Sequence, residues 1–262
     1  MRVIVLCAGQ GTRLRPLTDE KPKCMVELMG KPLLEHQFDA LNAAGIDDIT
    51  LVTGYAAERL EGWGRRQIHN PEYADTNMVW SLFCARDMFD GKSDLIVAYS
   101  DIVYESRVID ALLAAPDPVA TVVDRDWLAL WSMRMDDPLA DAETLRLNAD
   151  GTLREIGNKA RSLSDCEGQY IGLTKISAAV QRSVLDHYEE LDRGDVYDGR
   201  RFEQMFMTRF ITSLIEAGYA ARAAIINSGW LEVDTLEDLR RYEALAGRGE
   251  LQRFWRPVAT GK

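Results

Sequence analysis

Residues 6–18 read LCAGQGTRLRPLT, and Pro22 and Lys23 follow shortly after. The stretch continues an apolar run, residues 3–7, which predicts a strand buried on both faces. A glycine loop directly after such a strand is typical of open α/β sheets, whose ligands lie at the carboxyl ends of the strands. Glycines let backbone N–H groups approach phosphate oxygens closely. The stretch therefore predicts an α/β fold with an anion site at its first loop.

Apolar runs alternate with helical patterns along the first half of the chain, which predicts a parallel sheet with helices on both faces. We expect strands at residues 49–53 and 95–99, and helices at 34–44, 56–63 and 79–88, the last capped by Thr76 or Asn77. The second half has shorter segments and more turns. We expect strands at 119–123 and 223–226, short antiparallel strands added to the sheet between 131 and 176, and helices at 178–191, 202–217 and 236–245.

The loop is locally basic although the chain is acidic. Residues 1–31 carry six basic and three acidic side chains, whereas the whole chain has a net charge of −11. Arg13 offers a planar fork to phosphate oxygens, Lys23 a compact charge and Thr12 a hydroxyl. Leu14 replaces the third glycine of a dinucleotide fingerprint, and no GK[ST] of a P-loop follows. The pattern therefore indicates a different phosphate-binding loop.

Composition excludes several classes of protein. The chain has 262 residues, of which 47% are hydrophobic and 28% charged, as is usual for a globular protein. Its acidity argues against nucleic-acid and anionic-membrane binding. The four cysteines form no CxxC pair, and no apolar run suits a signal peptide or a membrane span. We therefore expect a cytoplasmic protein without zinc or disulfides.

The pattern A-x-G-x-G-T-R-L-R-P-L-T…P-K resembles that of the nucleotidyltransferases that join a nucleoside triphosphate to a phosphorylated substrate. These are the sugar-1-phosphate nucleotidyltransferases and their cytidylyltransferase relatives. The resemblance spans nearly the whole chain and implies a Rossmann-like three-layer α/β fold with a mostly parallel central sheet and an antiparallel extension on the acceptor side. It implies one domain, residues 1–262, with a nucleotide-binding half at 1–118 and an acceptor-binding half at 119–262.

The same resemblance assigns residues to the nucleotide. Arg13 and Lys23 would be catalytic, holding the triphosphate and the transition state. The other residues expected at the nucleotide are Leu6, Ala8, Gly9, Gly11 and Thr12.

Two aspartates are candidate ligands for Mg²⁺. Asp101 lies just after the expected strand at 95–99, and Asp234 lies in the segment E-V-D-T near the C-terminus. Taken alone, each could simply cap a helix, and Asp234 does precede a helix-like start. The resemblance instead implies that both carboxylates bind Mg²⁺, a cation that usually takes one or two carboxylates together with substrate phosphates.

The nucleotide preference rests on a second pattern. Residues 70–73 read N-P-E-Y and residues 77–82 read N-M-V-W-S-L, which resembles the small cytidylyltransferases for phosphocholine, 2-aminoethylphosphonate or phosphoglutamine. This favours CTP, with Asn77 and Ser81 near the cytosine. The alternative is that Asn77 only caps its helix and Ser81 only packs within it.

The acceptor is expected between the central sheet and the antiparallel strands. Tyr170, Trp230 and Trp80 are candidate contacts, because aromatic faces and a carboxylate suit a cationic amine. Lys159 is a candidate for the acceptor phosphate. The alternatives are that the aromatic residues belong to the core and that Lys159 is solvated.

The expected reaction is in-line attack of an acceptor oxygen on the α-phosphorus, with pyrophosphate leaving. The expected partners are a nucleoside triphosphate and a small anionic acceptor, with no nucleic acid or membrane. Three alternatives remain open: a sugar-1-phosphate nucleotidyltransferase using UTP or dTTP, a non-catalytic nucleotide-binding relative, and a glycosyltransferase, although residues 100–103 lack its D-x-D. The acceptor and the oligomeric state, a homo-oligomer included, remain open as well.

Overall fold

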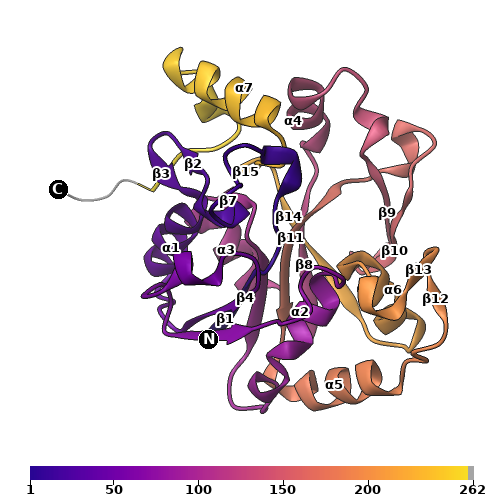
Figure 1. Ribbon diagram of the computed structural model, residues 1–262. Coiled ribbons are helices and arrows are strands. Elements are labelled where there is room, and N and C mark those ends of the chain that lie inside the picture. Colours follow the sequence, from indigo (N-terminus) through magenta and orange to yellow (C-terminus); the bar gives the residue numbers. More distant parts are fainter. Residues whose placement is uncertain (259–262) are drawn as a thin grey trace.

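A seven-stranded sheet lies at the centre of the computed structural model, which describes residues 1–258 (Figure 1). All neighbouring strands are parallel except β11, which runs antiparallel to β6 and β8. In spatial order the strands are β14 (Ala221–Ile226), β8 (Val119–Asp124), β11 (Gln169–Ile176), β6 (Leu95–Tyr99), β1 (Arg2–Cys7), β4 (Ile49–Thr53) and β5 (Arg66–His69). The expected mostly parallel α/β sheet is confirmed.

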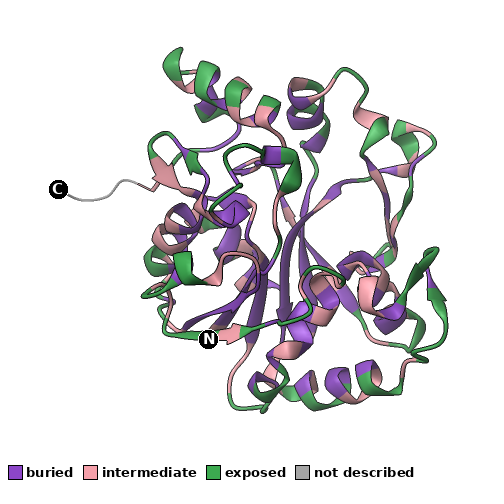
Figure 2. Ribbon diagram, in the orientation of Figure 1, coloured by how far each residue is buried: buried purple, intermediate pink, exposed green. Residues whose placement is uncertain are grey.

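Two hydrophobic cores cover the two faces of this sheet. Alternate residues of β1 point to opposite faces, so that Val3 and Val5 enter one core and Ile4 and Leu6 the other. This explains why β1 reads as a continuous apolar run. One face is covered by α1 (Leu33–Ala43), α3 (Ser106–Ala114), α4 (Trp127–Arg134) and α7 (Leu236–Gly247), and the other by α2 (Met78–Cys84), α5 (Gln181–Glu190) and α6 (Met207–Glu216). Figure 2 shows the buried strands between helices whose outer faces are exposed.

Several short strands lie outside the central sheet. The pair β9 (Glu143–Leu147) and β10 (Leu153–Lys159) forms an antiparallel hairpin of its own, although we expected these strands to join the central sheet. Of the antiparallel strands expected between 131 and 176, only β11 does so. The other pairs are β7 (Ile102–Tyr104) with β15 (Trp230–Glu232), β2 (Glu27–Leu28) with β3 (Lys31–Pro32), and β12 (Val196–Tyr197) with β13 (Arg200–Arg201).

Three expected helices are shorter than their patterns suggest. The segment at 56–63 forms only the 3₁₀ turn η3 (Ala57–Leu60), because Ala56 and Gly62 on either side take left-handed conformations. Helix α2 ends at Cys84 and continues as the turn η4 (Arg86–Met88). Helix α6 begins only at Met207, after the turn η8 (Phe202–Gln204). Across residues 1–258, no helix combines the length and apolar composition that crossing a bilayer requires.

Candidate active site at the carboxyl edge of the sheet

The glycine loop leaves β1 at the edge where the parallel strands end. Gly11 adopts a left-handed conformation with φ of 63°, and a Cβ there would lie 2.8 Å from Cβ of Lys23. Only glycine combines this conformation with so close an approach. Gly11 therefore lets the loop pack against Lys23, the first residue of the 3₁₀ turn η2 (Lys23–Met25).

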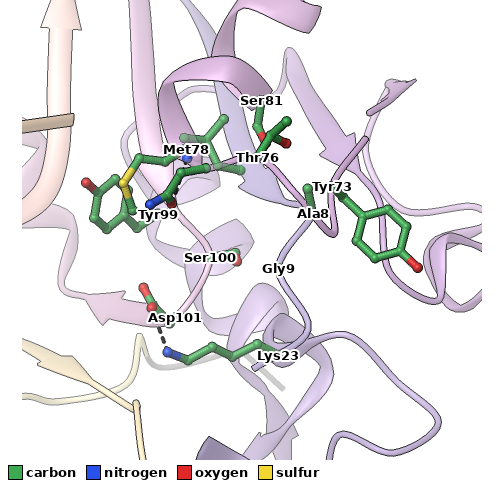
Figure 3. Close-up of a pocket in the computed structure, with 12 residues that line it drawn as sticks. Ala8, Gly9, Lys23, Tyr73, Thr76, Met78, Ser81, Tyr99, Ser100 and Asp101 are labelled. Carbon is green, nitrogen blue, oxygen red and sulfur yellow. Dashed lines mark hydrogen bonds and ion pairs between the residues drawn. The ribbon is translucent and has the colours of Figure 1, made fainter. Parts of the chain in front are cut away.

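Lys23 joins the two aspartates that the sequence singled out. Its Nζ donates to Oδ2 of Asp101 at 2.7 Å and to Oδ1 of Asp234 at 2.5 Å. Asp101 follows β6, and Asp234 lies between β15 and α7. Figure 3 shows Lys23 extending below the first loop toward Asp101. Three segments far apart in the sequence thus place one cation and two carboxylates in a single cluster.

The charge of Lys23 is stabilised in this cluster. Burial opposes the charged ammonium, but Asp101, Asp234 and Glu232 outweigh it, and the pKa of Lys23 is held above its ordinary value. Burial also raises the pKa of Glu232, which Arg134 only partly offsets. Lys23 is therefore a permanent cation at neutral pH.

Arg13 approaches the same cluster from the solvent side. It belongs to the 3₁₀ turn η1 (Thr12–Leu14), and its guanidinium forms an ion pair with the carboxylate of Asp234. Its side chain is 66% exposed, in contrast to 11% for Lys23. Arg13 is thus the accessible cation of the site, whereas Lys23 is its buried one.

The two aspartates fit a divalent cation. Oδ1 of Asp101 is buried and has no hydrogen-bond partner, so one carboxylate oxygen lacks the partner that burial demands. Hard oxygen ligands from one or two carboxylates, completed by substrate phosphates and water, are the usual protein contribution to a Mg²⁺ site. No group of three or more His, Cys, Asp or Glu side chains suited to a metal occurs among the described residues.

A first cavity opens above this cluster, between the glycine loop and the start of α2. Figure 3 shows Lys23 and Asp101 at one side of it and Thr76 and Ser81 at the other. The lining residues are Leu6, Ala8, Gly9, Lys23, Tyr73, Thr76, Asn77, Met78, Ser81, Tyr99, Ser100 and Asp101. Seven of the residues selected from the sequence thus share one cavity. Gly11 and Thr12 do not line it and lie in the adjoining part of the loop.

Asn77 and Ser81 combine structural contacts with a place in this cavity. The side chain of Asn77 accepts a hydrogen bond from the backbone N–H of Met78 at 2.9 Å, so it does cap α2. The hydroxyl of Ser81 accepts a hydrogen bond from Nδ2 of Asn70 at 3.0 Å. Asn70 is fully buried and also donates to Thr76 Oγ1 at 3.0 Å. Sequence reasoning placed Asn70 only in a loop, although the N-P-x-Y pattern had marked its position.

A second cavity adjoins the first and shares Met78 and Tyr99 with it. Its aromatic residues include the expected Tyr170 and Trp230. Arg13 lines it next to the charged cluster, which consists of Lys23, Asp101, Asp234 and Arg13 itself. The ring of Tyr99 meets that of Tyr170 edge to face at 5.7 Å. The full lining is Arg13, Met78, Tyr99, Trp131, Asp141, Glu143, Gln169, Tyr170, Phe206, Thr208, Trp230 and Glu232.

Two of the residues expected at the acceptor lie elsewhere. Lys159 lines a separate surface depression on the β9–β10 hairpin, together with Arg146 and Arg161. Trp80 packs on the other side of α2 against Phe202, with ring centroids 6.4 Å apart. Neither lines the second cavity.

No sequence pattern marked the carboxylates of the second cavity, except that Glu232 lies in the E-V-D-T segment. Burial and the neighbouring carboxylates raise the pKa of Glu143 to about 7. Burial also raises the pKa of Asp141. Glu232 is held by Arg134, whose guanidinium also pairs with Asp238. The cavity is therefore acidic and aromatic, and Arg13 brings positive charge to one side of it.

Hydrogen bonds to the carboxylate of Asp238 hold the backbone of Asp234 in place. The carboxylate of Asp238 accepts the backbone N–H of Asp234 at 3.1 Å and that of Thr235 at 2.9 Å. Thr235 and Asp238 form a capping box at the start of α7. The helix start suggested by the sequence is thus present, and it leaves the carboxylate of Asp234 free to face Lys23 and Arg13.

Comparison with known proteins gives one matching family model and several relatives. Residues 3–163 match the model described as the MobA-like NTP transferase domain. The chain is 42% identical over 248 residues to the CTP:phosphoglutamine cytidylyltransferase of Campylobacter jejuni, which covers 91% of this chain and 98% of that protein. It is 30% identical over 258 residues to the CMP-5′-(3-aminopropyl)phosphonate synthase of Streptomyces rubellomurinus, which covers 92% of this chain and 38% of that protein.

Solved structures agree in fold. The CTP:phosphocholine cytidylyltransferase of Streptococcus pneumoniae superposes with a TM-score of 0.69 at 22% identity, over 94% of this chain and 98% of that one. The glucose-1-phosphate thymidylyltransferase-like protein of Bacillus anthracis has a TM-score of 0.73 at 18% identity, over 100% of this chain and 98% of that one. At this level of identity the likeness concerns the fold.

Proposed function

Because the chain belongs to the MobA-like NTP transferase family and is a nucleotidyltransferase, we propose that it transfers CMP from CTP to a small phosphorylated or phosphonate acceptor. The observation that carries this proposal is that two cavities meet at Met78 and Tyr99, with Lys23 and Asp101 lining the first and Arg13 the second. The first cavity takes the nucleotide and the second the acceptor. CTP is favoured because the relative that matches over nearly its full length uses it.

The two halves of the chain line different cavities. The first cavity is lined entirely by residues of 1–118, and the second mostly by residues of 119–262. Tyr170 and Trp230 line the cavity proposed for the acceptor, and Asn77 and Ser81 line the one proposed for the nucleotide. This supports a nucleotide-binding half and an acceptor-binding half.

The proposed reaction needs positioning and charge neutralisation more than a protein base. An oxygen of the acceptor phosphate or phosphonate, already ionised near neutral pH, attacks the α-phosphorus of CTP. The new P–O bond forms as the bond to the β-phosphate oxygen breaks, and pyrophosphate leaves with that electron pair. No proton has to move, which agrees with the absence of histidine from the lining of both cavities.

The residues of the charged cluster have distinct roles in this reaction. Arg13, whose exposed guanidinium offers a planar fork, binds the phosphates that develop charge. Lys23 keeps its positive charge beside Asp101 and Asp234 and balances the approach of two anions. Asp101 and Asp234 would hold Mg²⁺, which would supply further neutralisation of phosphate charge.

The test is a matrix of nucleotides and acceptors. The purified protein with Mg²⁺ is given CTP, UTP, dTTP, ATP or GTP, each with phosphoglutamine, phosphocholine, 2-aminoethylphosphonate or glucose-1-phosphate. Pyrophosphate release and the mass of the product are measured. Turnover with CTP and an amine-bearing acceptor, lost in Arg13→Ala and Asp101→Asn, supports the proposal. Turnover with UTP or dTTP and glucose-1-phosphate would transfer the protein to the sugar-1-phosphate branch.

A further inference from the structure

We propose that Glu143 is the residue that recognises a cationic amine on the acceptor, and that it selects amine-bearing acceptors over neutral ones. This inference rests on the proposed function, because it concerns the second cavity as the acceptor site. It adds a specificity-determining residue that no sequence pattern marked.

The main chain of Glu143 is fixed at the wall of the second cavity. Glu143 begins β9, and the buried side chain of Gln169 on β11 holds its backbone from both sides. The N–H of Glu143 donates to Oε1 of Gln169 at 3.0 Å, and Nε2 of Gln169 donates to the carbonyl oxygen of Glu143 at 2.6 Å. Both residues line the cavity. The hydrogen bonds from Gln169 therefore fix the point on the cavity wall from which the side chain of Glu143 extends.

The charged groups around Glu143 favour the binding of a cation. Each of the charged groups that perturbs it is another carboxylate, from Asp141, Glu232 or Asp198. Burial and these neighbours raise the pKa of Glu143 to about 7, and no basic group is among the charges that act on it. A partly buried carboxylate without a cationic partner is costly, and a ligand ammonium would supply a charge-assisted hydrogen bond.

The other acidic residues of the cavity are less suited to this role. Glu232 is already paired with Arg134, and its neighbour Asp234 belongs to the charged cluster. Asp141 is more exposed than Glu143, and the cations Arg134 and Arg13 partly offset the rise that burial causes in its pKa. Glu143 is therefore the carboxylate of this cavity that an ammonium group of the ligand stabilises most.

The aromatic lining and the far side of the cavity complete the match. Tyr170 and Tyr99 are partly exposed in this lining, and their rings can attract an ammonium or a quaternary amine. Trp131 and Trp230 are buried, and Arg134 already lies over the ring of Trp131 at 5.0 Å. Arg13 lines the same cavity and supplies positive charge at the cluster side. The cavity thus fits a small dipolar molecule, with its phosphate or phosphonate at the charged cluster and its amine at Glu143.

The experiment compares two acceptors that differ only in the amine. Phosphoethanolamine and ethyl phosphate are assayed with CTP and Mg²⁺ on wild-type protein, Glu143→Gln and the control Glu167→Gln. Glu167 is an exposed carboxylate that lines neither cavity. We expect Glu143→Gln to raise KM for phosphoethanolamine about tenfold to a hundredfold, the usual value of a hydrogen bond to a charged group. KM for CTP and the reaction of ethyl phosphate should remain unchanged, and Glu167→Gln should match wild type.

Binding measurements keep the inference separate from the proposed function. If neither compound is turned over, calorimetry in the presence of CTP compares their affinities directly. Preference of wild type for phosphoethanolamine, lost in Glu143→Gln, would support the amine site even if the reaction differs from the one proposed. Equal affinity for the two compounds, or an amine preference that survives in Glu143→Gln, would overturn it. Failure of CTP turnover with every acceptor would instead count against the proposed function.

Discussion

The ammonium of Lys23 lies 2.5 Å from Oδ1 of Asp234, a residue 211 positions later in the chain. The same ammonium lies 2.7 Å from Oδ2 of Asp101. This pairing brings the first loop, the end of β6 and the start of α7 to one point. It also means that Lys23 pairs with both carboxylates that we expect to hold Mg²⁺.

Removing Lys23 should therefore weaken the fold and expose the metal site. We expect Lys23→Met to lower the free energy of unfolding by about 3 kcal/mol, because two carboxylates lose a largely buried partner. Mg²⁺ should then raise the unfolding temperature more in this variant than in wild type, since the carboxylates are free to bind it. Thermal unfolding with increasing Mg²⁺ measures both effects, with the surface variant Lys92→Met as control. Equal Mg²⁺ shifts in variant and wild type would contradict the shared site.

Neutralising the aspartates should abolish turnover while sparing the fold. Asp101→Asn and Asp234→Asn are expected to lower kcat at least about a hundredfold, because charge neutralisation by a bound metal contributes several kcal/mol to such reactions. Asp110→Asn, an exposed aspartate on α3, should behave as wild type. Product formation from CTP, together with circular dichroism of each variant, gives the comparison. Wild-type turnover in Asp101→Asn would remove this residue from the site.

The glycine loop offers a pair of matched substitutions. Gly11→Ala and Gly45→Ala both force alanine into a left-handed conformation, at a cost of about 1 kcal/mol. A Cβ at Gly45 meets no atom within 4 Å, whereas one at Gly11 lies 2.8 Å from Cβ of Lys23. We expect Gly45→Ala to lose some stability but keep its activity, and Gly11→Ala to lose both. Denaturant unfolding and initial rates separate strain from displacement of Lys23, and identical behaviour of the two variants would show that the contact is unimportant.

The pKa of Glu143 predicts a pH-dependent difference in stability. Its ordinary value is 4.5, and in the folded protein it is about 7, so between these values the native state retains a proton that the unfolded chain has released. Raising the pH through this window therefore lowers the free energy of unfolding. Glu143→Gln should remove this loss, so that the variant is more stable than wild type at pH 7.5 and equal to it near pH 4. Urea unfolding of both proteins across this range checks the sign, and a constant difference would refute it.

Asn70 should affect the nucleotide more than the acceptor. Its side chain holds Ser81 and Thr76 at the first cavity through two hydrogen bonds. We expect Asn70→Ala to raise KM for CTP about tenfold and to reduce the preference for CTP over UTP, because the two hydroxyls lose their fixed positions. Asn42→Ala, at an exposed position of α1, is the control. An unchanged CTP preference would show that Asn70 serves only the fold.

The parts of the fold that local patterns could predict are those with strong periodicity. The runs in β1, β4, β6 and β8 are continuous and apolar because helices cover both faces of the sheet, so the strands were recognisable. The edge strand β5, with Arg66 and Gln67, and the three-residue strands β7 and β15 carry no such pattern. Helix α4 was also missed, because the segments from 131 onward are short and separated by turns, which suggested strands. These elements depend on their neighbours in the fold.

The sequence by itself determined the sheet and the glycine loop, because these lie in contiguous segments with strong local patterns. The set of Arg13, Lys23, Asp101 and Asp234 was marked by the resemblance to a family, and the structure brings these four residues together. Only the tertiary structure decided which residues line the second cavity, proposed for the acceptor, because α4, α6, β9, β11 and β15 all contribute to it and share no motif. It left Trp80 and Lys159 outside that cavity and placed Glu143 within it. The physical reason is that a carboxylate can be identified as lacking a counter-charge only from its neighbours in space. The order of residues along the chain does not give those neighbours.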